Sequence, residues 1–384
     1  MFEKALSGDK KYWTWIFFLM AIMGVGFLCW LYQFKNGLSV TGLSRDVSWG
    51  FYIAQFTFLV GVAASAVMVV LPYYLHNYKA FGKITILGEF LAIGSVLMCM
   101  TFIFVDMGQP FRSLNVILHP TLNSPMFWDF ISLGGYLGLN ILIGLIALES
   151  ERKSEAPPKW IKPFIYLSIP WAVSIHTVTA FLYQGLGARH FWMTAIMAPR
   201  FLASAFSAGP ALLILLCFVL RKVSKFDAGR EAIQKLAEIV TYAMAVNVFF
   251  VCMEFFTALY SDLPAAVVHF KYLFIGLEGA SLAPWMWISS ILAIVSLILL
   301  INPRTRRNEK TLIVACITTY TSLWIDKGLG LVVAGFIPNP LGKVQAYIPT
   351  AIELMISLSI YAMGAFIVTI LYKITLSVRE ELAA

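Results

Sequence analysis

The chain has 384 residues, of which 60% are hydrophobic and 12% are charged, and its mean hydropathy is +0.82. This composition excludes a soluble domain, whose core would not need so much apolar sequence, and it is typical of a protein that crosses a membrane many times. The net charge of +8 does not require a nucleic-acid partner, because the distribution of basic residues described below accounts for it. The five cysteines lie in apolar runs without metal-ligand spacing, so we expect neither a metal site nor an iron-sulfur cluster.

Ten segments are long and apolar enough to cross a bilayer as helices, which requires about 20 mostly apolar residues. The first apolar run lacks a small-residue cleavage site, so we interpret it as a retained helix and not as a signal peptide. We therefore predict an all-α polytopic membrane protein. The predicted spans are residues 12–34, 47–75, 83–106, 124–148, 162–185, 200–221, 232–260, 281–301, 311–337 and 347–373.

Basic residues are distributed unevenly over the connections between these spans. Twenty of the 28 lysines and arginines lie on the side of the N-terminus, in alternation with the predicted crossings. Because cytoplasmic connections collect Lys and Arg, both termini are predicted to be cytoplasmic. The outward connections carry the seven residues Lys35, Arg45, Arg112, Arg189, Arg200, Lys271 and Lys343.

The two halves of the chain carry similar short patterns in the same order. FLVGVAASA at residues 58–66 corresponds to FLASAFSAG at 201–209, and SPMFW at 124–128 corresponds to APWMW at 283–287. Four spans separate the copies, which predicts a parallel repeat of two four-helix bundles with two peripheral helices. Chance recurrence of small residues in membrane helices is the alternative. The predicted units are a first helix and outward loop (1–46), an N-terminal bundle with the candidate site (47–185), a C-terminal bundle (186–346) and a last helix with a cytoplasmic tail (347–384).

Asp129 is an acidic residue inside an apolar span, about one helical turn from its start. An ionisable group in hydrocarbon is costly unless it faces protein, water or a ligand, so Asp129 is a candidate functional residue. The corresponding position of the second bundle is Ile288, which places the expected chemistry in the N-terminal bundle. The alternative is a structural role, in which the negative charge of Asp129 stabilises the positive N-terminal end of its own helix.

Other polar residues lie within the spans and suggest a route for protons. Glu89, Asn140 and His176 are predicted to form, together with Asp129, a ladder of protonatable or hydrogen-bonding groups. Static packing is the alternative for Asn140 and Glu89. In the second half we predict an ion pair between Lys327 and Glu254, with a proton relay through these two residues as the alternative.

The histidines argue against an intrinsic haem. A b-type haem in a helical bundle requires two facing histidines, and only His176 is expected deep within a span. We therefore expect neither haem nor a metal ion in this chain.

Several short motifs recur from the second to the ninth span. They are WG at 49–50, DMGQP at 106–110, WD at 128–129 with GYL at 135–137 and Asn140, SIHTVTAF at 174–181, APRFLASAF at 198–206 with GPA at 209–211, and WIDKGLGLVVAGFIP at 324–338. Together these motifs resemble the NrfD/PsrC family of quinone-interacting membrane subunits, and the last of them is most similar to the DsrP subunits of sulfite-reduction-associated DsrMKJOP complexes. The resemblance implies a location in a prokaryotic cytoplasmic (inner) membrane.

The resemblance implies a haem-free subunit of a respiratory complex that reacts with menaquinol or menaquinone and is not active alone. Asp129 would accept a proton at a quinone site near the outward face, and His176 would belong to this site or to the proton path. Trp128, Gly135 and Tyr136 would line the site, and the glycines of the same span would leave room for the isoprenoid tail. A separate hypothesis, suggested by the polar residues within the spans, is that turnover is coupled to proton translocation along Glu89, Asn140, His176, Glu254 and Lys327.

The implied partners are an extracytoplasmic ferredoxin-like iron-sulfur subunit, a multihaem cytochrome c, and further membrane and cytoplasmic subunits of a DsrMKJOP-like complex. Membrane lipids are expected around the spans, and nucleic acid is not expected. Two rival functions fit the sequence. A secondary transporter would use the parallel repeat and the buried charges, and a passive membrane anchor would have no quinone chemistry of its own.

Overall fold

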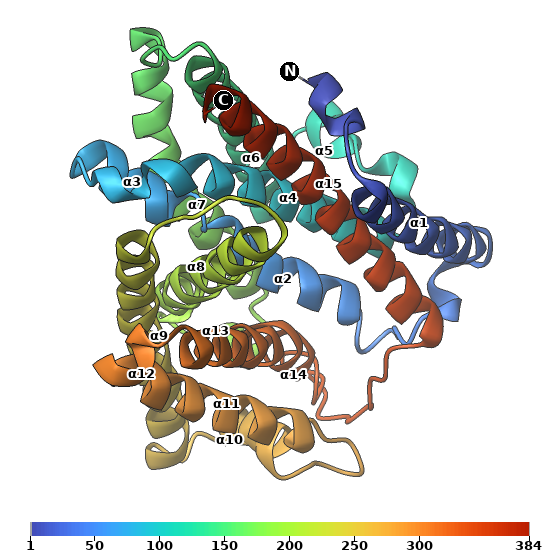
Figure 1. Cartoon of the computed structure of the whole chain (residues 1–384). Helices are drawn as coiled ribbons and strands as arrows, with labels where there is room; N and C mark the ends of the chain where they lie inside the picture. Colours follow the sequence, from blue (N-terminus) through green and yellow to red (C-terminus); the bar gives the residue numbers. More distant parts are fainter. Residues whose placement is uncertain (1, 384) are drawn as a thin grey trace.

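The computed structural model describes residues 2–383, and over this range the chain is helical apart from connections and one isolated bridge between Leu277 and Ala280. The long helices form a single bundle (Figure 1). They are α1 (Lys10–Asn36), α2 (Phe51–Ala63), α3 (Val67–Leu75), α4 (Gly82–Asp106), α6 (Pro125–Arg152), α7 (Lys162–Gln184), α8 (Met197–Val223), α9 (Arg230–Tyr260), α11 (Ala283–Ile301), α13 (Glu309–Leu323) and α15 (Ala351–Ala383).

Short helices fill the connections between the long ones. Two of these short helices, α5 and α10, lie in connections that are predicted to face outward. The short elements are η1 (Phe2–Leu6), η2 (Gly37–Val40), η3 (Lys79–Phe81), η4 (Pro110–Arg112), α5 (Asn115–Leu118), η5 (Lys159–Ile161), η6 (His190–Trp192), α10 (Pro264–Phe274), α12 (Pro303–Arg307), η7 (Trp324–Gly330) and α14 (Leu331–Ala334).

Nine helical segments of the described range are long and apolar enough to cross a membrane, with α2 and α3 counted together. The prediction of a multi-pass helical membrane protein is therefore confirmed. A helix satisfies its backbone hydrogen bonds internally, which is why long apolar sequences take this form in lipid. The ninth predicted span, residues 311–337, is not among these nine, because it is divided into α13, η7 and α14 in succession.

The second predicted span, residues 47–75, is interrupted at Ala64–Ala66 between α2 and α3. Ser65 bonds through its backbone N–H to Val62 O at 3.0 Å, which is a tighter turn than in an α-helix. Two glycines from neighbouring helices pack at this turn. A Cβ atom on Gly209 of α8 would lie 2.8 Å from Ser65 N, and one on Gly88 of α4 would lie 3.4 Å from Ser65 O. The interruption therefore lies where α4 and α8 pack closely against the turn between α2 and α3.

The helix η7 is π-helical, with wider turns than the α-helices on either side of it. It contains the adjacent residues Asp326 and Lys327, whose side chains contact different groups, as described below. Its glycines allow close packing, since a Cβ atom on Gly328 would lie 3.1 Å from Ala54 O of α2. Single π-helical turns within α-helices are frequent at functional sites, and this one lies between the two halves of the molecule.

The helices of the two halves pack in the same order. In the first half α2 packs against α4, α4 against α6, and α6 against α7; in the second half α8 packs against α9, α9 against α11, and α11 against α13. Across the junction α2 packs against α8, α7 against α8, and η7 against α2. This order agrees with two four-helix bundles, and the internal repeat itself stays a prediction.

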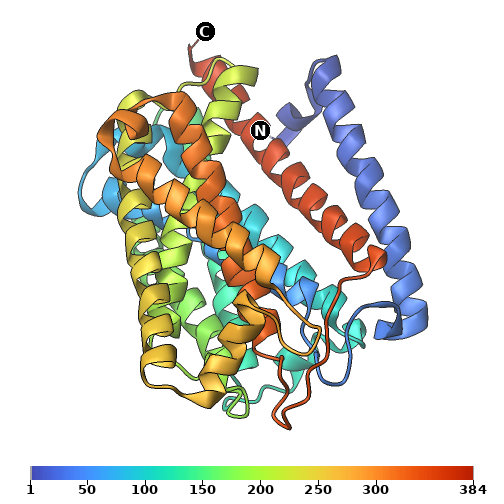
Figure 2. The same ribbon diagram turned by 90° about the horizontal axis from the view of Figure 1, so that it is seen from below.

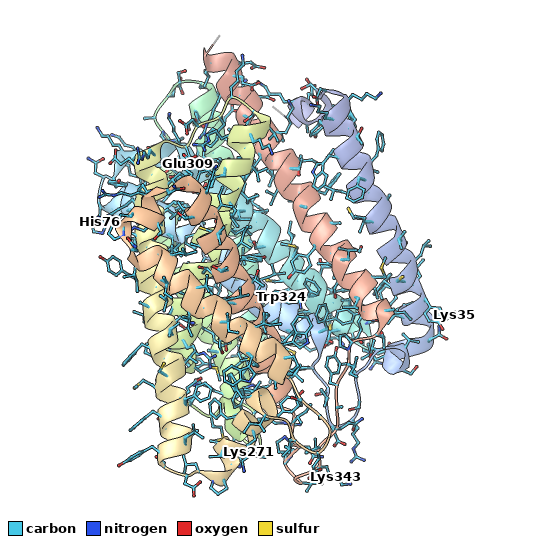
Figure 3. All side chains as sticks on the ribbon, turned by 60° about the horizontal axis from the view of Figure 1, so that its bottom comes forward. Lys35, His76, Lys271, Glu309, Trp324 and Lys343 are labelled. Carbon is cyan, nitrogen blue, oxygen red and sulfur yellow. The ribbon has the colours of Figure 1, made fainter. Side chains whose placement is uncertain are left out.

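The helices α1 and α15 lie together at one side of the molecule (Figure 2). They approach closely at Gly26, where a Cβ atom would lie 2.0 Å from the Ser359 side chain. The first and last residues described lie at the same end of the bundle, where Lys4 forms an ion pair with Glu381. We call this end the terminal end, and we call the opposite end, which carries α5, α10 and residues 335–350, the loop end. Lys271 and Lys343 mark the loop end, His76 and Glu309 mark the terminal end, and Trp324 lies between them (Figure 3).

A buried carboxylate holds the connections of the loop end together. Glu353, in the first turn of α15, is 0% exposed. Its Oε1 accepts from the Tyr347 hydroxyl at 2.7 Å, and its Oε2 accepts from the backbone N–H groups of Gly42 at 2.7 Å and Thr350 at 2.8 Å. The Tyr347 hydroxyl in turn accepts from the N–H of Phe51 at 2.7 Å. The start of α2, the connection before it and the connection before α15 are therefore joined through one side chain.

Candidate functional site

The helix α6 buries one face and exposes the other. The buried face carries Asp129, Tyr136 and Asn140. They are spaced by seven and then four residues, which places them on one side of a helix. Gly134 and Gly138 lie on roughly the opposite side, where a Cβ atom would meet nothing within 4 Å. The space beside these glycines is open but lies away from the Asp129 carboxylate, and the expectation that they leave room for an isoprenoid tail stays a prediction.

The Asp129 carboxylate is buried between α6 and α7 and is held by one hydroxyl group. Thr179 Oγ1 lies 2.6 Å from Asp129 Oδ1 and 2.7 Å from Ile175 O. A hydroxyl carries a single hydrogen, so Thr179 donates either to the carboxylate or to the carbonyl. It can donate to Asp129 when the acid is ionised, and accept from it when the acid is protonated. Within the described residues Asp129 Oδ2 accepts no hydrogen bond, which leaves this oxygen available to another donor.

An aromatic cluster lies one turn from Thr179 towards the loop end. The hydroxyl groups of Tyr183 and Thr57 are hydrogen-bonded to each other, which joins α7 to α2. Trp192 packs against the Tyr183 ring, with 5.0 Å between ring centroids, and its Nε1 donates to Leu331 O at 2.9 Å. Trp49 stacks on Trp192, with 5.9 Å between centroids. These rings fill the junction between the two halves of the molecule.

Three residues predicted to line the quinone site take different positions. The Trp128 side chain is 48% exposed, and its Nε1 donates to Leu122 O at 2.8 Å. Gly135 faces Trp171, since a Cβ atom there would lie 2.3 Å from Trp171 Cζ2. Tyr136 is buried, and its hydroxyl donates to Ala63 O at 3.3 Å. Asp129 and Tyr136 share the interior, whereas Trp128 points outward.

The predicted proton ladder consists of buried groups that are not directly bonded to one another. Glu89 is 1% exposed and His176 is 0% exposed. Within the described residues, neither the carboxylate oxygens of Glu89 nor the ring nitrogens of His176 have a hydrogen-bond partner. Asn140 Nδ2 donates to the backbone O of Tyr136 at 2.8 Å. The ladder as a proton path stays a prediction.

The second half of the molecule buries an arginine between two carboxylates. Arg200 is 8% exposed, and its Nη2 donates to both carboxylate oxygens of Asp326 at 2.8 Å. Its Nη1 donates to Glu254 Oε2. We call Arg200, Glu254 and Asp326 the ion triad. It joins α8, α9 and η7.

The ion triad corrects two expectations. Glu254 pairs with Arg200, so the predicted ion pair between Lys327 and Glu254 is wrong. Arg200 is expected from the sequence in an outward connection, but it lies within α8, which begins at Met197, and its side chain is buried. An arginine is the side chain best suited to such a position, since its planar guanidinium group binds two carboxylates at once.

Lys327 is a buried cation without a carboxylate partner among the described residues. Its Nζ lies 3.4 Å from Phe201 O and 4.3 Å from the centroid of the Phe201 ring. Gly61 of α2 provides the space around the ammonium group, because a Cβ atom there would lie 3.2 Å from Nζ. Asp326 and Lys327 therefore contact α8 through adjacent residues, Arg200 and Phe201, but with opposite charges.

A cavity of about 270 Å³ lies beside the ion triad. All three members of the triad line it, together with Asn247 of α9 and side chains of α10 and α11. Its other walls are largely aromatic and aliphatic.

These features define a multi-pass helical membrane protein with buried carboxylates in both of its halves. The family model described as polysulphide reductase, NrfD, matches residues 39–336. The chain belongs to this family, and the predicted family membership is confirmed. The match extends from the connection before α2 to just beyond the end of α14 and thus contains both Asp129 and the ion triad.

Three named proteins are similar in sequence to this chain over most of its length. The chain is 25% identical to a Halobacterium salinarum protein named for the membrane part of a dimethyl sulfoxide reductase, over 93% of this chain and 89% of the relative. It is 24% identical to the Hdr-like menaquinol oxidoreductase integral membrane subunit of Archaeoglobus fulgidus, over 79% and 74%. It is 22% identical to the menaquinone reductase integral membrane subunit of Nitratidesulfovibrio vulgaris, over 95% and 91%.

Two residues of the candidate sites were not singled out from the sequence. Thr179 lies three residues after His176 in the same motif, and its partnership with Asp129 depends on how α6 and α7 pack. The signal for Arg200 was its neighbour Pro199, because proline is common in the first turn of a helix and so favours a helix start before Arg200.

Proposed function

We propose that this protein is the membrane subunit of a respiratory oxidoreductase complex and that it reacts with menaquinol or menaquinone. Two relatives are named as menaquinol or menaquinone oxidoreductase membrane subunits, and family membership supports the same role here. The observation that carries the proposal is the Asp129 carboxylate, buried near the loop end with Oδ1 held by Thr179 and Oδ2 available. A quinol hydroxyl is a suitable donor to Oδ2.

Oxidation of a quinol releases two electrons and two protons, and a proton acceptor within hydrogen-bond distance of the ring oxygen speeds this reaction. In our proposal Asp129 Oδ2 takes one of these protons. Thr179 donates to Oδ1 of the ionised carboxylate, and once Oδ2 carries the proton the same hydroxyl can donate either to Oδ1 or to Ile175 O, so it has an acceptor in both states. Tyr136 lies on the same face of α6 and would flank the ring.

The electrons would pass to an extracytoplasmic ferredoxin-like iron-sulfur subunit at the loop end, and from there to a multihaem cytochrome c. The motif at residues 324–338 favours a DsrP-like subunit of a DsrMKJOP-like complex. In this proposal both termini are cytoplasmic. The ordered helices of the loop end, among them α5 and α10, support docking at this end of the bundle.

Proton translocation is part of the proposal. Glu89 and His176 are buried and have no hydrogen-bond partner among the described residues, so each is free to bind transient water or to change protonation. With Asn140, Glu254 and Lys327 they would form the path. Vesicles with reconstituted complex should acidify or alkalinise during turnover, and Glu89→Gln should abolish the pH change while electron transfer continues. A pH change that is equal in Glu89→Gln and wild type would overturn this path.

The decisive experiment substitutes Asp129 in the intact complex. Asp129→Asn keeps the shape of the side chain and removes its ability to take a proton, so we expect menaquinol-analogue oxidation to slow by roughly two powers of ten, the usual contribution of general-base catalysis. The matched control is Asp262→Asn, at an exposed position in a connection, which should leave the rate unchanged.

Each result has a definite meaning. Wild-type rates in Asp129→Asn, with all subunits co-purifying, would indicate a passive anchor or a quinone site elsewhere. Substrate uptake by the protein without its partners would favour a transporter.

A further inference from the structure

The cavity beside the ion triad has properties of a ligand site in the second half of the molecule. Its volume of about 270 Å³ is near the lower limit of small-molecule sites, roughly 300 Å³, and is large enough for a ring but not for a whole lipid. It is bounded by α9, α10, α11 and η7 and lies apart from Asp129, which is on α6.

The polar wall of the cavity presents acceptors that have no donor within the described residues. Asn247 is 2% exposed and lines the cavity, and its Oδ1 has no hydrogen-bond partner. Glu254 Oε2 is bonded to Arg200, whereas Oε1 accepts no bond from the described residues. Glu254 follows Asn247 by seven residues, so both lie on one face of α9, two turns apart. A buried acceptor without a donor is costly, and a ligand that brings donors would satisfy both.

The wall offers no cation to an anionic ligand. Its one guanidinium group, on Arg200, is already bonded to the two carboxylates of the ion triad, and the ammonium group of Lys327 does not line the cavity. A phosphate or carboxylate group would meet carboxylates here without a free cation, and charges in a medium of low dielectric constant interact strongly. An uncharged head group with hydroxyl donors is the complementary chemistry.

The remaining walls match an aromatic ring with an apolar tail. Phe191, Phe255, Phe270 and Phe274 line the cavity and can pack against a flat ring. Cys252 of α9 and Ile294 of α11 also line the cavity and are exposed on the outer, lipid-facing side. The cavity therefore opens between α9 and α11, and a tail can leave through this opening into the membrane.

We propose that this cavity is a second binding site, which takes the hydroquinone form of a prenylated aromatic lipid, with its hydroxyl groups at Asn247 and Glu254 and its tail between α9 and α11. The site rests on the proposed function for the identity of its ligand class. It does not depend on Asp129, and the two sites can be tested separately. The oxidised quinone form carries only acceptors at its ring oxygens and would bind more weakly.

The test is photolabelling of the intact complex with a farnesylated naphthoquinol that carries a diazirine on its first isoprene unit. We expect labelled peptides from α9 and α11, with at least fivefold less labelling by the oxidised naphthoquinone form of the probe. Asn247→Leu should lower this labelling at least fivefold, and Val246→Leu, at a neighbouring position that does not line the cavity, is the matched control. Ala293→Phe, which fills the cavity from α11, should have the same effect as Asn247→Leu.

A phosphatidylcholine with a diazirine in its acyl chain separates a ligand site from a lipid groove. If it labels α9 and α11 as strongly as the naphthoquinol probe and both probes are insensitive to Asn247→Leu, the cavity is a lipid groove and the proposal fails. The proposal also fails if the naphthoquinol labels neither helix, or labels Asn247→Leu as well as wild type. Loss of oxidation in Asp129→Asn with unchanged labelling of α9 supports both proposals, and unchanged oxidation in Asp129→Asn overturns only the role of Asp129.

Discussion

The two halves of the molecule bury charge in different ways. In the first half, the Asp129 carboxylate has one hydrogen-bonding partner among the described residues, a threonine hydroxyl that can also bond Ile175 O. Arg200 in the second half is held by two carboxylates from two other helices. The first arrangement can change its protonation with little loss, and the second loses an ion pair if any member is removed. The difference indicates that Asp129 can gain or lose a proton at a small cost in free energy, whereas the ion triad fixes the positions of its helices.

The largest effect is expected from Arg200→Met, which removes the centre of the ion triad. Glu254 and Asp326 would then be two buried carboxylates without a cation, and breaking a buried pair in this way costs about 3–5 kcal/mol. We expect a corresponding decrease in the free energy of unfolding, measured by denaturant titration in detergent. The triple variant Arg200→Met with Glu254→Gln and Asp326→Asn should recover much of the loss, because no charge is left unpaired. If Arg200→Met alone were as stable as wild type, the ion triad would not contribute to the stability of the fold.

Thr179→Val tests the other half of the comparison. The substitution keeps the shape of the side chain and removes the one hydroxyl that bonds the Asp129 carboxylate within the described residues. A hydrogen bond to a charged group contributes about 1.5–3 kcal/mol, so we expect menaquinol-analogue oxidation in the intact complex to slow by roughly tenfold or more. Thr179→Ser retains the hydroxyl and should stay near the wild-type rate. Equal rates in the valine and serine variants would exclude a role for this hydroxyl.

Lys327→Met should have a smaller effect on stability than Arg200→Met. Lys327 has a carbonyl and an aromatic ring as partners, and no carboxylate among the described residues, so its removal leaves no buried anion unpaired. We expect a change of about 1 kcal/mol or less in the free energy of unfolding, as for a single cation–π contact. A loss as large as that of Arg200→Met would restore the ion pair with Glu254 that the sequence suggested.

The smallest expected effect is a pH dependence at the loop end of the second half. His269 of α10 lies within hydrogen-bond distance of Ala334 O and Ile337 O, at 2.7 and 3.0 Å from its Nδ1, so Nδ1 carries the hydrogen. Burial lowers the pKa of His269, and the nearby positive charge of Arg189 lowers it further. The unfolded chain, with a histidine pKa of about 6.5, therefore binds the proton first as the pH falls.

It follows that His269 destabilises the folded protein as the pH falls below about 6.5, and that this loss is complete once the pH is below the folded pKa. The midpoint of thermal unfolding should decrease more in wild type than in His269→Gln between about pH 7.5 and about pH 5.5. Equal decreases in the two proteins would contradict this assignment.

The sequence was sufficient for the spans and for the burial of Asp129, because apolar length and a lone acid are local signals. It was not sufficient for the break between α2 and α3, which depends on glycines of α4 and α8 that pack against Ser65. The π-helical turn at Trp324–Gly330 has no distinct pattern of apolar residues. Arg200 was misplaced because a charge at the start of an apolar run resembles the end of a loop.

The partners of the charged residues were the least predictable part of the site. Asp326 and Lys327 are adjacent in sequence, and their side chains contact two adjacent residues of α8, Arg200 and Phe201 respectively. Trp128 and Asp129 are likewise adjacent, and only the acid points inward. Which neighbour of a pair faces the interior depends on the rotation of its helix against the others, and this rotation follows from packing of the whole bundle.

The hydrogen bonds of Glu353 have a further consequence for assembly. This carboxylate joins the start of α2 to the connections before α2 and before α15. The backbone of these segments is therefore already ordered in the folded protein. A protein that docks on them meets a surface that needs no further ordering, and the entropic cost of association is correspondingly small. If a partner docks at the loop end, as we propose, the order already present in these segments would strengthen its binding and fix the spacing between the two proteins.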